Sequence, residues 1–261
     1  MNIPCEVDFR LSMIVNEFLV VIVIGVIFLL ISMVLDIIWA QMIPFRFLYY
    51  VMRAPGVIIH ECSHVFGCLI TGAKIQKVVL FSCSGGSVSY VRPVVPYIGD
   101  VVISMAPLFG IPLILVGITW VFQTYLGCYF PPFPLTFDTL SSVQELFAGI
   151  ISLFYQNLIV HFNIWFFPYL YLTISLAVSM APSNQDIRNS AIGIMIIILV
   201  GILILWSNIP FAADALLTVT QVLGMGIALG FIFGLIALIV SIPLIILYIK
   251  KRVTDPQAKF P

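Results

Sequence analysis

The sequence predicts an all-α polytopic membrane protein with about six transmembrane helices and one small membrane-associated β-hairpin. Hydrophobic residues make up 62% of the 261 residues and charged residues only 8%, whereas soluble domains carry about 25% charged residues. Apolar runs long enough to cross about 30 Å of hydrocarbon recur along the chain. One stretch, residues 72–97, is too polar to span and has the composition of β-strands.

Six apolar runs are predicted to span the membrane, and they divide the whole chain without a second domain. Pro107 and Pro112 are expected to kink the third run, because proline has no N–H for the helix ladder. The six predicted spans are residues 14–35, 47–71, 97–126, 161–181, 191–206 and 222–249. We read residues 1–261 as a single integral membrane domain, with a core at about 47–190 and flanking helices at about 14–35 and 222–249.

Two further segments are predicted to lie outside the spans. Residues 75–81 and 87–91 are rich in β-branched and aromatic residues, and Ser84-Gly85-Gly86 supplies a turn between them, which predicts a β-hairpin. Its unpaired edge could accept an extended peptide by strand addition, or it is a plain surface hairpin. Residues 141–157 are moderately apolar and either lie at the membrane interface or form part of a re-entrant segment.

The positions of lysine and arginine predict the orientation in the cell membrane. With six spans, Arg46 and Arg53 lie on one side and the other nine basic residues on the opposite side. Under the positive-inside rule, both termini are then cytoplasmic. The nine residues are Arg10, Lys74, Lys77, Arg92, Arg188, Lys250, Lys251, Arg252 and Lys259. The net charge is zero and no long basic run is present, so we expect a lipid bilayer and no nucleic acid as partner.

The last predicted span carries Gly226, Gly230 and Gly234 at four-residue spacing. Glycines stacked on one helix face let another helix approach closely, so this face is expected to be a helix–helix contact. The spacing leaves open whether the partner helix belongs to the same chain or to a second copy in a homo-oligomer.

The second predicted span contains an H-E-x-x-H pattern, His60-Glu61-Cys62-Ser63-His64. Each residue of a helix turns about 100°, so His60 and His64 lie about 40° apart on one face, and Cys62 points away from them. This spacing lets two imidazoles bind one zinc ion and leaves Glu61 within reach of a water on the metal. With only three histidines in the chain, such a pattern arises by chance on the order of once in two thousand sequences.

A catalytic zinc usually has three protein ligands and one open position. Asp186 follows the fourth predicted span on the cytoplasmic side, where the H-E-x-x-H motif also lies, and it is our first candidate for the third ligand. His161, at the opposite end of that span, is the second candidate, and the sequence leaves the choice between the two open. Asp100 is interpreted as a residue of a helix N-terminus, where the helix dipole favours negative charge.

The motif, the hairpin and the distant aspartate together resemble the site-2 protease family of intramembrane zinc metalloproteases. The resemblance covers roughly residues 47–190 and is strongest in His60–His64. In that family, the segment bearing the third ligand usually reads Asn, prolines, then Leu-Asp-Gly. The matching stretch here is Ala181-Pro182-Ser183-Asn184-Gln185-Asp186-Ile187, with no Leu before the Asp and no Gly after it. These departures indicate a divergent member.

The resemblance implies hydrolysis of peptide bonds in or near transmembrane segments of a membrane protein substrate. Glu61 would be the general base for a zinc-activated water, and Zn²⁺ would be bound by His60, His64 and Asp186. Asn184 would donate a hydrogen bond to the developing oxyanion. The hairpin would hold the substrate in extended form through Val78, Val79, Leu80, Gly85 and Gly86.

Two other functions stay open. A membrane transporter for divalent metal ions would use the same ligands as a transit site, but a transport pathway needs polar residues in several spans. The first, fifth and last predicted spans have almost none at their centres. A non-catalytic membrane scaffold would have no physical need for Glu61 between the two histidines.

Overall fold

The computed structural model describes residues 3–254 except 44–45, 83–84, 92, 134–139, 182 and 208. Within these ranges the protein is helical apart from one two-stranded sheet, so the predicted all-α class with a hairpin is confirmed. The elements are α1 (Ile3–Met42), α2 (Arg46–Thr71), β1 (Ile75–Val79), β2 (Ser87–Tyr90), α3 (Ile98–Tyr125), α4 (Leu140–Tyr155), the π-helical turn η1 (Gln156–Val160), α5 (Phe166–Val178), α6 (Asn184–Trp206) and α7 (Pro210–Thr254).

In the described part of the chain, four helices are long and apolar enough to cross a membrane. They correspond to the first, third, fifth and last predicted spans. Their apolar stretches are Val15–Gln41, Ile98–Tyr125, Asp186–Ile204 and Phe211–Pro243. The predicted count of six is not confirmed. The polar residues of the H-E-x-x-H motif lower the mean hydropathy of α2, and α5 has only 13 residues, whereas a spanning helix needs about 20.

Helix α5 begins later than the sequence predicts because its first expected turn forms a different local structure. The side-chain oxygen of Asn163 accepts a hydrogen bond from the backbone N–H of Trp165 at 2.9 Å. Its side-chain nitrogen donates to the carbonyl of Leu126 at 2.7 Å. Short polar side chains that bond to nearby backbone in this way compete with helix formation, so the helix starts at Phe166.

The helices meet around a core that is centred on Tyr169 of α5, whose side chain is fully buried. Its ring contacts the aromatic rings of Phe122, Phe130 and Phe233. Its hydroxyl lies 2.9 Å from the Thr119 hydroxyl, which satisfies the one polar atom of this side chain. The core therefore joins α5 to α3 and α7.

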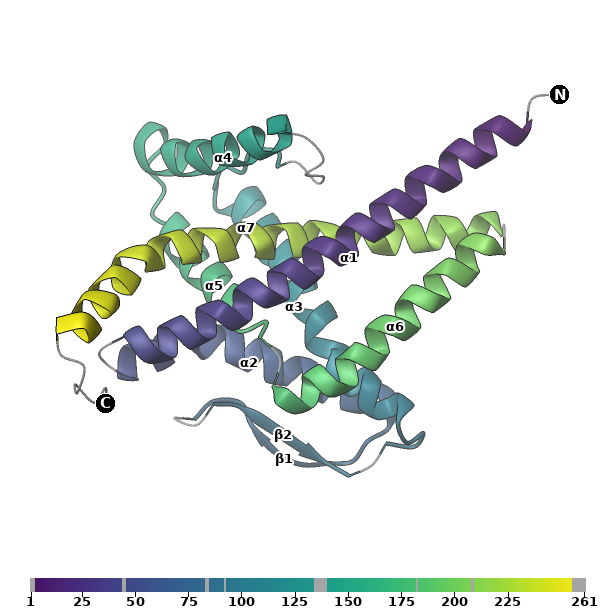
Figure 1. The fold of residues 1–261 in the computed structure, drawn as a ribbon, viewed down its shortest axis with the longest axis horizontal. Helices are drawn as coiled ribbons and strands as arrows, with labels where there is room; N and C mark the ends of the chain where they lie inside the picture. The colour runs from purple at the N-terminus through teal and green to yellow at the C-terminus, as the bar shows by residue number, and fades with distance from the viewer. Residues whose placement is uncertain are drawn as a thin grey trace.

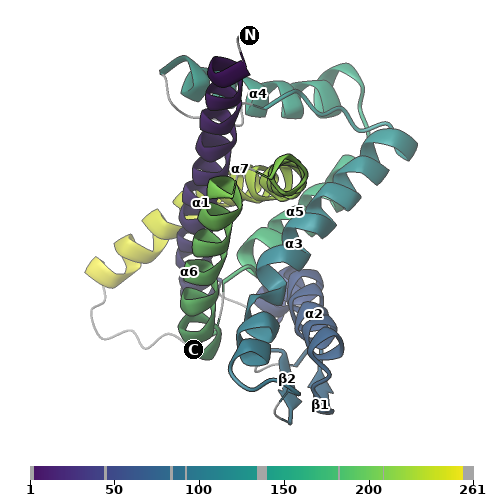
Figure 2. The ribbon, with the colours of Figure 1, turned by 90° about the vertical axis from the view of Figure 1, so that its right-hand side faces the viewer.

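The long helices cross one another, and the hairpin and α4 mark the two ends of the molecule. In Figure 1, α7 runs along the molecule and α1 crosses it diagonally, and these two helices share the most extensive contact. In both views α4 lies across one end and the hairpin at the other (Figures 1 and 2). The start of α1 lies toward the α4 end, away from the hairpin. The sequence predicts that the N-terminus and the hairpin lie on the same side of the membrane, and the structure does not agree with this prediction.

The segment 141–157 forms α4 and the first residues of η1, and it lies across the ends of α3 and α5 (Figure 2). Buried Asn157 anchors it: its amide accepts a hydrogen bond from the N–H of Tyr129 and donates to the carbonyls of Tyr129 and Leu153. Whether this segment lies at the membrane interface or is part of a re-entrant segment stays a prediction.

The predicted hairpin is confirmed. Strands β1 and β2 pair antiparallel with Val78 opposite Val88, and the register shifts between Ile75 and Lys77. Gly85 has φ of 98°, a conformation that favours glycine, and it lies in a turn closed by hydrogen bonds with Ser82. Ser84 of the predicted turn lies outside the described residues.

The three stacked glycines of α7 do make the predicted close helix contact, and the contact is within the chain. A Cβ atom on Gly226 would collide with the backbone of Pro112 in α3, and one on Gly230 would collide with the ring of Phe28 in α1. At Gly234 a Cβ atom would lie 3.1 Å from the side chain of Ile31. A second copy could not reach this face without displacing α1 and α3.

Helix α7 also begins earlier than predicted. The last span is predicted over residues 222–249, but the helix starts at Pro210 and continues without a break to Thr254. Proline is well suited to the first turn of a helix, because its missing N–H would have no partner there and its φ already matches.

Candidate metal centre

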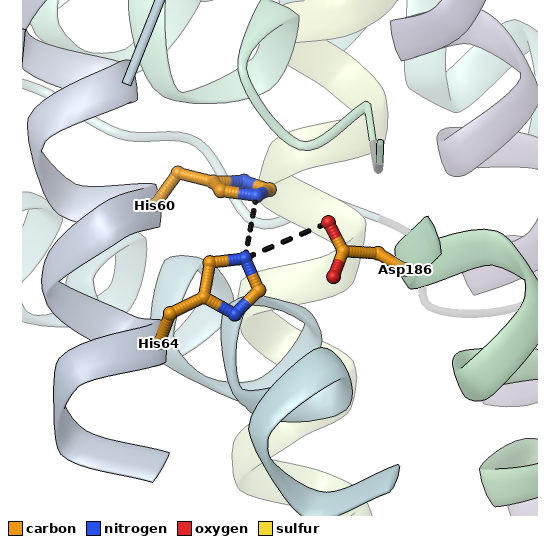
Figure 3. A group of neighbouring side chains, drawn as sticks. All are labelled: His60, His64 and Asp186. Carbon is orange, nitrogen blue, oxygen red and sulfur yellow. Dashed lines mark hydrogen bonds and ion pairs between the residues drawn. The ribbon is translucent and has the colours of Figure 1, made fainter. Parts of the chain in front are cut away.

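His60, His64 and Asp186 converge at the junction of α2 and α6 (Figure 3). Their ligand atoms all lie within 4.8 Å of one another, and all three side chains are buried. The two histidine Nε2 atoms are 3.2 Å apart, and the Nε2 atom of His64 is 3.6 Å from the Oδ2 atom of Asp186. The structure thus brings together the two histidines and the first candidate for the third ligand.

Backbone carbonyls determine which ring nitrogen of each histidine carries the proton. The Nδ1 atom of His60 lies 2.8 Å from the carbonyl oxygen of Ser179, and that of His64 lies 2.8 Å from the carbonyl oxygen of Ile103. A carbonyl oxygen can only accept, so both Nδ1 atoms are donors. In the neutral rings, the two Nε2 atoms therefore turn lone pairs toward each other, and this is the arrangement that metal-binding histidines use.

The spacing of these atoms fits a metal ion. Tetrahedral zinc with Zn–N distances of about 2.05 Å places two nitrogen ligands about 3.3 Å apart, close to the 3.2 Å between His60 and His64. Two buried lone pairs and a carboxylate repel one another unless a proton or a cation lies between them. Two imidazoles and one carboxylate suit a divalent transition metal, and the choice of zinc stays a prediction.

Pro107 explains why the carbonyl of Ile103 is available to His64. In a regular helix the carbonyl of residue 103 would accept a hydrogen bond from the N–H of residue 107, but proline has none. The freed carbonyl of α3 instead faces α2 and accepts from His64. The two helices approach closely here, because a Cβ atom on Gly67 would lie 2.9 Å from the Cα atom of Ile103.

Replacing Pro107 with alanine is therefore expected to weaken metal binding by about 10- to 100-fold, the usual cost of losing a group that orients a ligand. The new N–H would compete with His64 for the carbonyl of Ile103. The matched control is Pro112→Ala, which alters the same helix at a second buried proline but leaves that carbonyl unchanged. Competition with a chromophoric chelator measures both affinities, and equal affinities in the two variants would contradict the assignment.

His60 depends in the same way on backbone groups at the crossing of α2 and α5. Pro55 leaves the carbonyl of Val51 without its helical partner, and the hydroxyl of Tyr171 donates to that carbonyl at 2.6 Å. The N–H of Gly56 donates to the hydroxyl of Ser175 at 3.0 Å. These contacts hold the last turn of α5 against α2, where the carbonyl of Ser179 accepts from His60.

A capping box positions Asp186 at the start of α6. Ser183 is the N-cap residue, and its hydroxyl accepts a hydrogen bond from the Asp186 N–H at 3.2 Å. The Asp186 carboxylate in turn accepts from the Ser183 N–H at 3.2 Å. This reciprocal arrangement directs the carboxylate back toward the chain that precedes the helix, and there it meets His64.

The three ligands line a cavity of about 420 Å³, and Glu61 and the glycine loop of the hairpin line it as well. Glu61 follows His60 directly and its side chain is buried. The loop lies so close that a Cβ atom on Gly86 would collide with the Glu61 side chain. The predicted general base therefore lies in the same cavity as the ligands and beneath the loop.

The predicted substrate-binding residues divide between the turn of the hairpin, which reaches the cavity, and the first strand with the residue after it, which do not. Gly85 and Gly86 line the cavity, but Val78, Val79 and Leu80 do not; the strand that does is β2. This strand faces the site because its side chains, with Ile75 of β1, pack against α2 and α3. The packed residues are Ile75, Val88, Tyr90, Cys68, Ala73 and Ile103.

Tyr90 at the end of β2 links the hairpin to α3. Its hydroxyl donates to a carboxylate oxygen of Asp100 at 3.2 Å. Burial, together with the negative charge of Asp100, raises the pKa of Tyr90 to about 12, so the hydroxyl stays protonated near neutral pH. Asp100 lies in the first turn of α3, as predicted.

Two predicted candidates lie elsewhere or outside the description. His161 is exposed at the end of η1 and is not among the residues that converge at the centre. The backbone of Asn184 belongs to the first turn of α6, but its side chain lies outside the described residues, so its oxyanion role stays a prediction.

Sequence reasoning missed several residues that build the site. The S-x-x-D pattern of Ser183 and Asp186 is a recognisable capping box, and it could have been found. The four-residue separation of Ile103 and Pro107 carries a weaker signal, because nothing local indicates which side chain will use the freed carbonyl. Arg53 enters the sequence argument only through the positive-inside rule, although its position seven residues before His60 places it on the same helix face.

No protein-family model, curated protein or solved structure matches the chain. The resemblance to the site-2 protease family therefore stays a prediction, and the site is interpreted from its own geometry.

Proposed function

We propose that the protein is an intramembrane zinc metalloprotease that hydrolyses peptide bonds in or near transmembrane segments of other membrane proteins. The observation that carries this proposal is the position of Glu61, a carboxylate in the same cavity as the convergent His60, His64 and Asp186. Transport or structural metal binding needs the three ligands alone. Hydrolysis also needs a nearby base, and here one lies next to them.

The roles of the residues follow from this geometry. His60, His64 and Asp186 would hold the ion, and the chemistry that zinc supplies when bound is polarisation of a carbonyl oxygen and a lowered pKa for water. Glu61 would accept a proton from the attacking water and deliver it to the leaving amine. Gly86 of the hairpin lies directly against this carboxylate and would limit access of bulk water to it.

The substrate is proposed to be a membrane protein because the site belongs to a strongly apolar helical body. A helical substrate must first unwind, since its carbonyls are otherwise hydrogen-bonded and shielded. The hairpin is placed to receive the extended segment by strand addition, with β2 beside the cavity. We place the hairpin on the cytoplasmic side of the cell membrane because three basic residues lie in it or next to it in the sequence, Lys74, Lys77 and Arg92. With the hairpin on that side, the predicted cytoplasmic N-terminus does not fit, because the start of α1 lies toward the opposite, α4 end of the molecule (Figure 2). Six spans, with α2 and α5 included, stay a prediction.

Metal-dependent cleavage tests the proposal. We expect the detergent-purified protein to contain one zinc ion per chain and to cleave single-span membrane proteins reconstituted with it in lipid vesicles. A chelator should abolish cleavage, and zinc should restore it. Cleavage that persists after complete removal of the metal, as verified by elemental analysis, would refute the proposal.

A further inference from the structure

We propose that Arg53 and Ser179 form a substrate-binding subsite that recognises a backbone carbonyl oxygen about three residues from the scissile bond. The inference rests on the proposed peptidase function and adds a polar contact that selects an extended, uncharged stretch of peptide. Near the metal centre, two buried polar atoms have no hydrogen-bond partner within the described part of the chain.

These two atoms are the Nε atom of Arg53 and the hydroxyl of Ser179. Among the described residues, they are the buried side-chain nitrogen and oxygen atoms without a hydrogen-bond partner. Buried polar groups in native proteins are nearly always paired, so an unpaired one marks a place for a ligand or water. Both residues line the cavity that contains the metal ligands. The unpaired groups therefore lie in the wall of the space that a substrate would enter.

The position of Arg53 on α2 extends the site in one direction. Seven residues separate it from His60, and seven residues turn an α-helix by about 700°, or 20° short of two full turns, so both lie on one face. Along the helix axis, the Cα atoms of Arg53 and His60 are about 10.5 Å apart. A second cavity, of about 160 Å³, shares Arg53, Val57 and Gly85 with the first and continues toward Tyr49 and Phe81. The site is thus elongated along α2.

The charge of Arg53 is already balanced, which determines the kind of ligand. Its Nη1 atom lies 3.1 Å from a carboxylate oxygen of Asp36 in α1 and donates to the hydroxyl of Tyr49 at 2.6 Å. A carboxylate ligand would leave one net negative charge in this partly buried pocket, at a high desolvation cost. A neutral acceptor keeps the pocket neutral and satisfies the unused N–H.

An extended peptide supplies such acceptors at the required spacing. Its backbone advances about 3.3 Å per residue. The separation of about 10.5 Å between Arg53 and His60 along α2 therefore corresponds to about three residues of extended peptide. A transmembrane segment that unwinds for cleavage loses its own helical hydrogen bonds, and each freed carbonyl needs a new donor in an apolar surrounding. The Nε–H of Arg53 and the hydroxyl of Ser179 would serve one of these carbonyls.

Peptide hydroxamates of different length test the subsite on the zinc-loaded protein. The hydroxamate group binds the metal, and a tripeptide extension reaches Arg53, whereas acetohydroxamate does not. Two tripeptides are needed, with the hydroxamate at the N-terminal or the C-terminal end, because the direction of the chain is part of the question. We expect one of them to bind more tightly than acetohydroxamate.

Two conservative variants isolate the unpaired groups. Arg53→Lys keeps the positive charge beside Asp36 but has no Nε–H, and Ser179→Ala removes only the hydroxyl, because the carbonyl that orients His60 belongs to the backbone. Each is expected to weaken the tripeptide about tenfold, as for one net hydrogen bond, and to leave acetohydroxamate binding unchanged. Ser32→Ala is the matched control, since this buried hydroxyl already donates to the carbonyl of Val178.

The outcomes separate this inference from the function on which it rests. Failure of the wild-type protein to bind zinc would refute the metalloprotease proposal and, with it, the subsite. Normal zinc and acetohydroxamate binding, with equal tripeptide affinity in wild type, Arg53→Lys and Ser179→Ala, would overturn the subsite alone. A tripeptide that binds no better than acetohydroxamate would also overturn it.

Discussion

Replacing Glu61 with glutamine is expected to abolish peptide hydrolysis while leaving the bound metal in place. Glutamine has nearly the same shape and fits beneath Gly86, but its amide cannot accept the proton of water. Loss of a general base costs about 10²- to 10⁴-fold in rate. The prediction is checked by comparing kcat for a reconstituted membrane substrate with the zinc content of the same preparation.

The control for this variant is Glu145→Gln. Glu145 is an exposed carboxylate on α4, which lies at the opposite end of the molecule from the hairpin (Figure 2). Its replacement should change neither kcat nor zinc content. A Glu61→Gln protein that retains both zinc and the wild-type kcat would show that Glu61 is not the base.

Replacing Asp186 with asparagine is expected to remove stoichiometric metal, because a neutral amide is a poor ligand for a divalent cation. The loss should exceed the about 10- to 100-fold that accompanies removal of an orienting group. Asparagine keeps the size of the side chain and can still accept from Ser183, so α6 retains its cap. Calorimetric titration with zinc measures the affinity, and the thermal midpoint provides a second readout, because a ligand that binds only the folded state stabilises it.

His161→Ala is the decisive comparison for the third ligand. His161 is exposed at the end of η1, so this variant should bind zinc as the wild type does and show the same zinc-dependent rise in thermal midpoint. Zinc retained in Asp186→Asn but lost in His161→Ala would reverse the assignment.

Local features of the sequence were sufficient to predict most of the elements. Helix α3 and the hairpin appear where apolar runs and turn residues place them, because these signals act within a few residues. Helix α6 ends at Trp206 as predicted but begins at Asn184 and not at residue 191, because the capping box of Ser183 and Asp186 starts the helix within the polar segment. The pairing of His60 with His64 is of the same kind, since four residues on a helix always return to one face. The boundaries of α5 and α7 were less predictable from hydropathy. Asn163 competes with the helix for backbone hydrogen bonds, and Pro210 favours the start of a helix through its fixed φ.

Only the tertiary structure decided which residues join the two histidines to complete the site. The sequence indicated that Asp186 was available, but the packing of α6 against α3 and the capping box bring it to the histidines. The same holds for the Ile103 carbonyl, the pairing of Arg53 with Asp36 and the contact of Gly226 with Pro112. A short motif encodes a spacing along one helix, whereas contacts between helices depend on how the whole chain packs. By itself, therefore, the sequence determined a membrane-type helical protein with two histidines poised for a metal, and the fold supplied the third ligand and the oriented cavity around them.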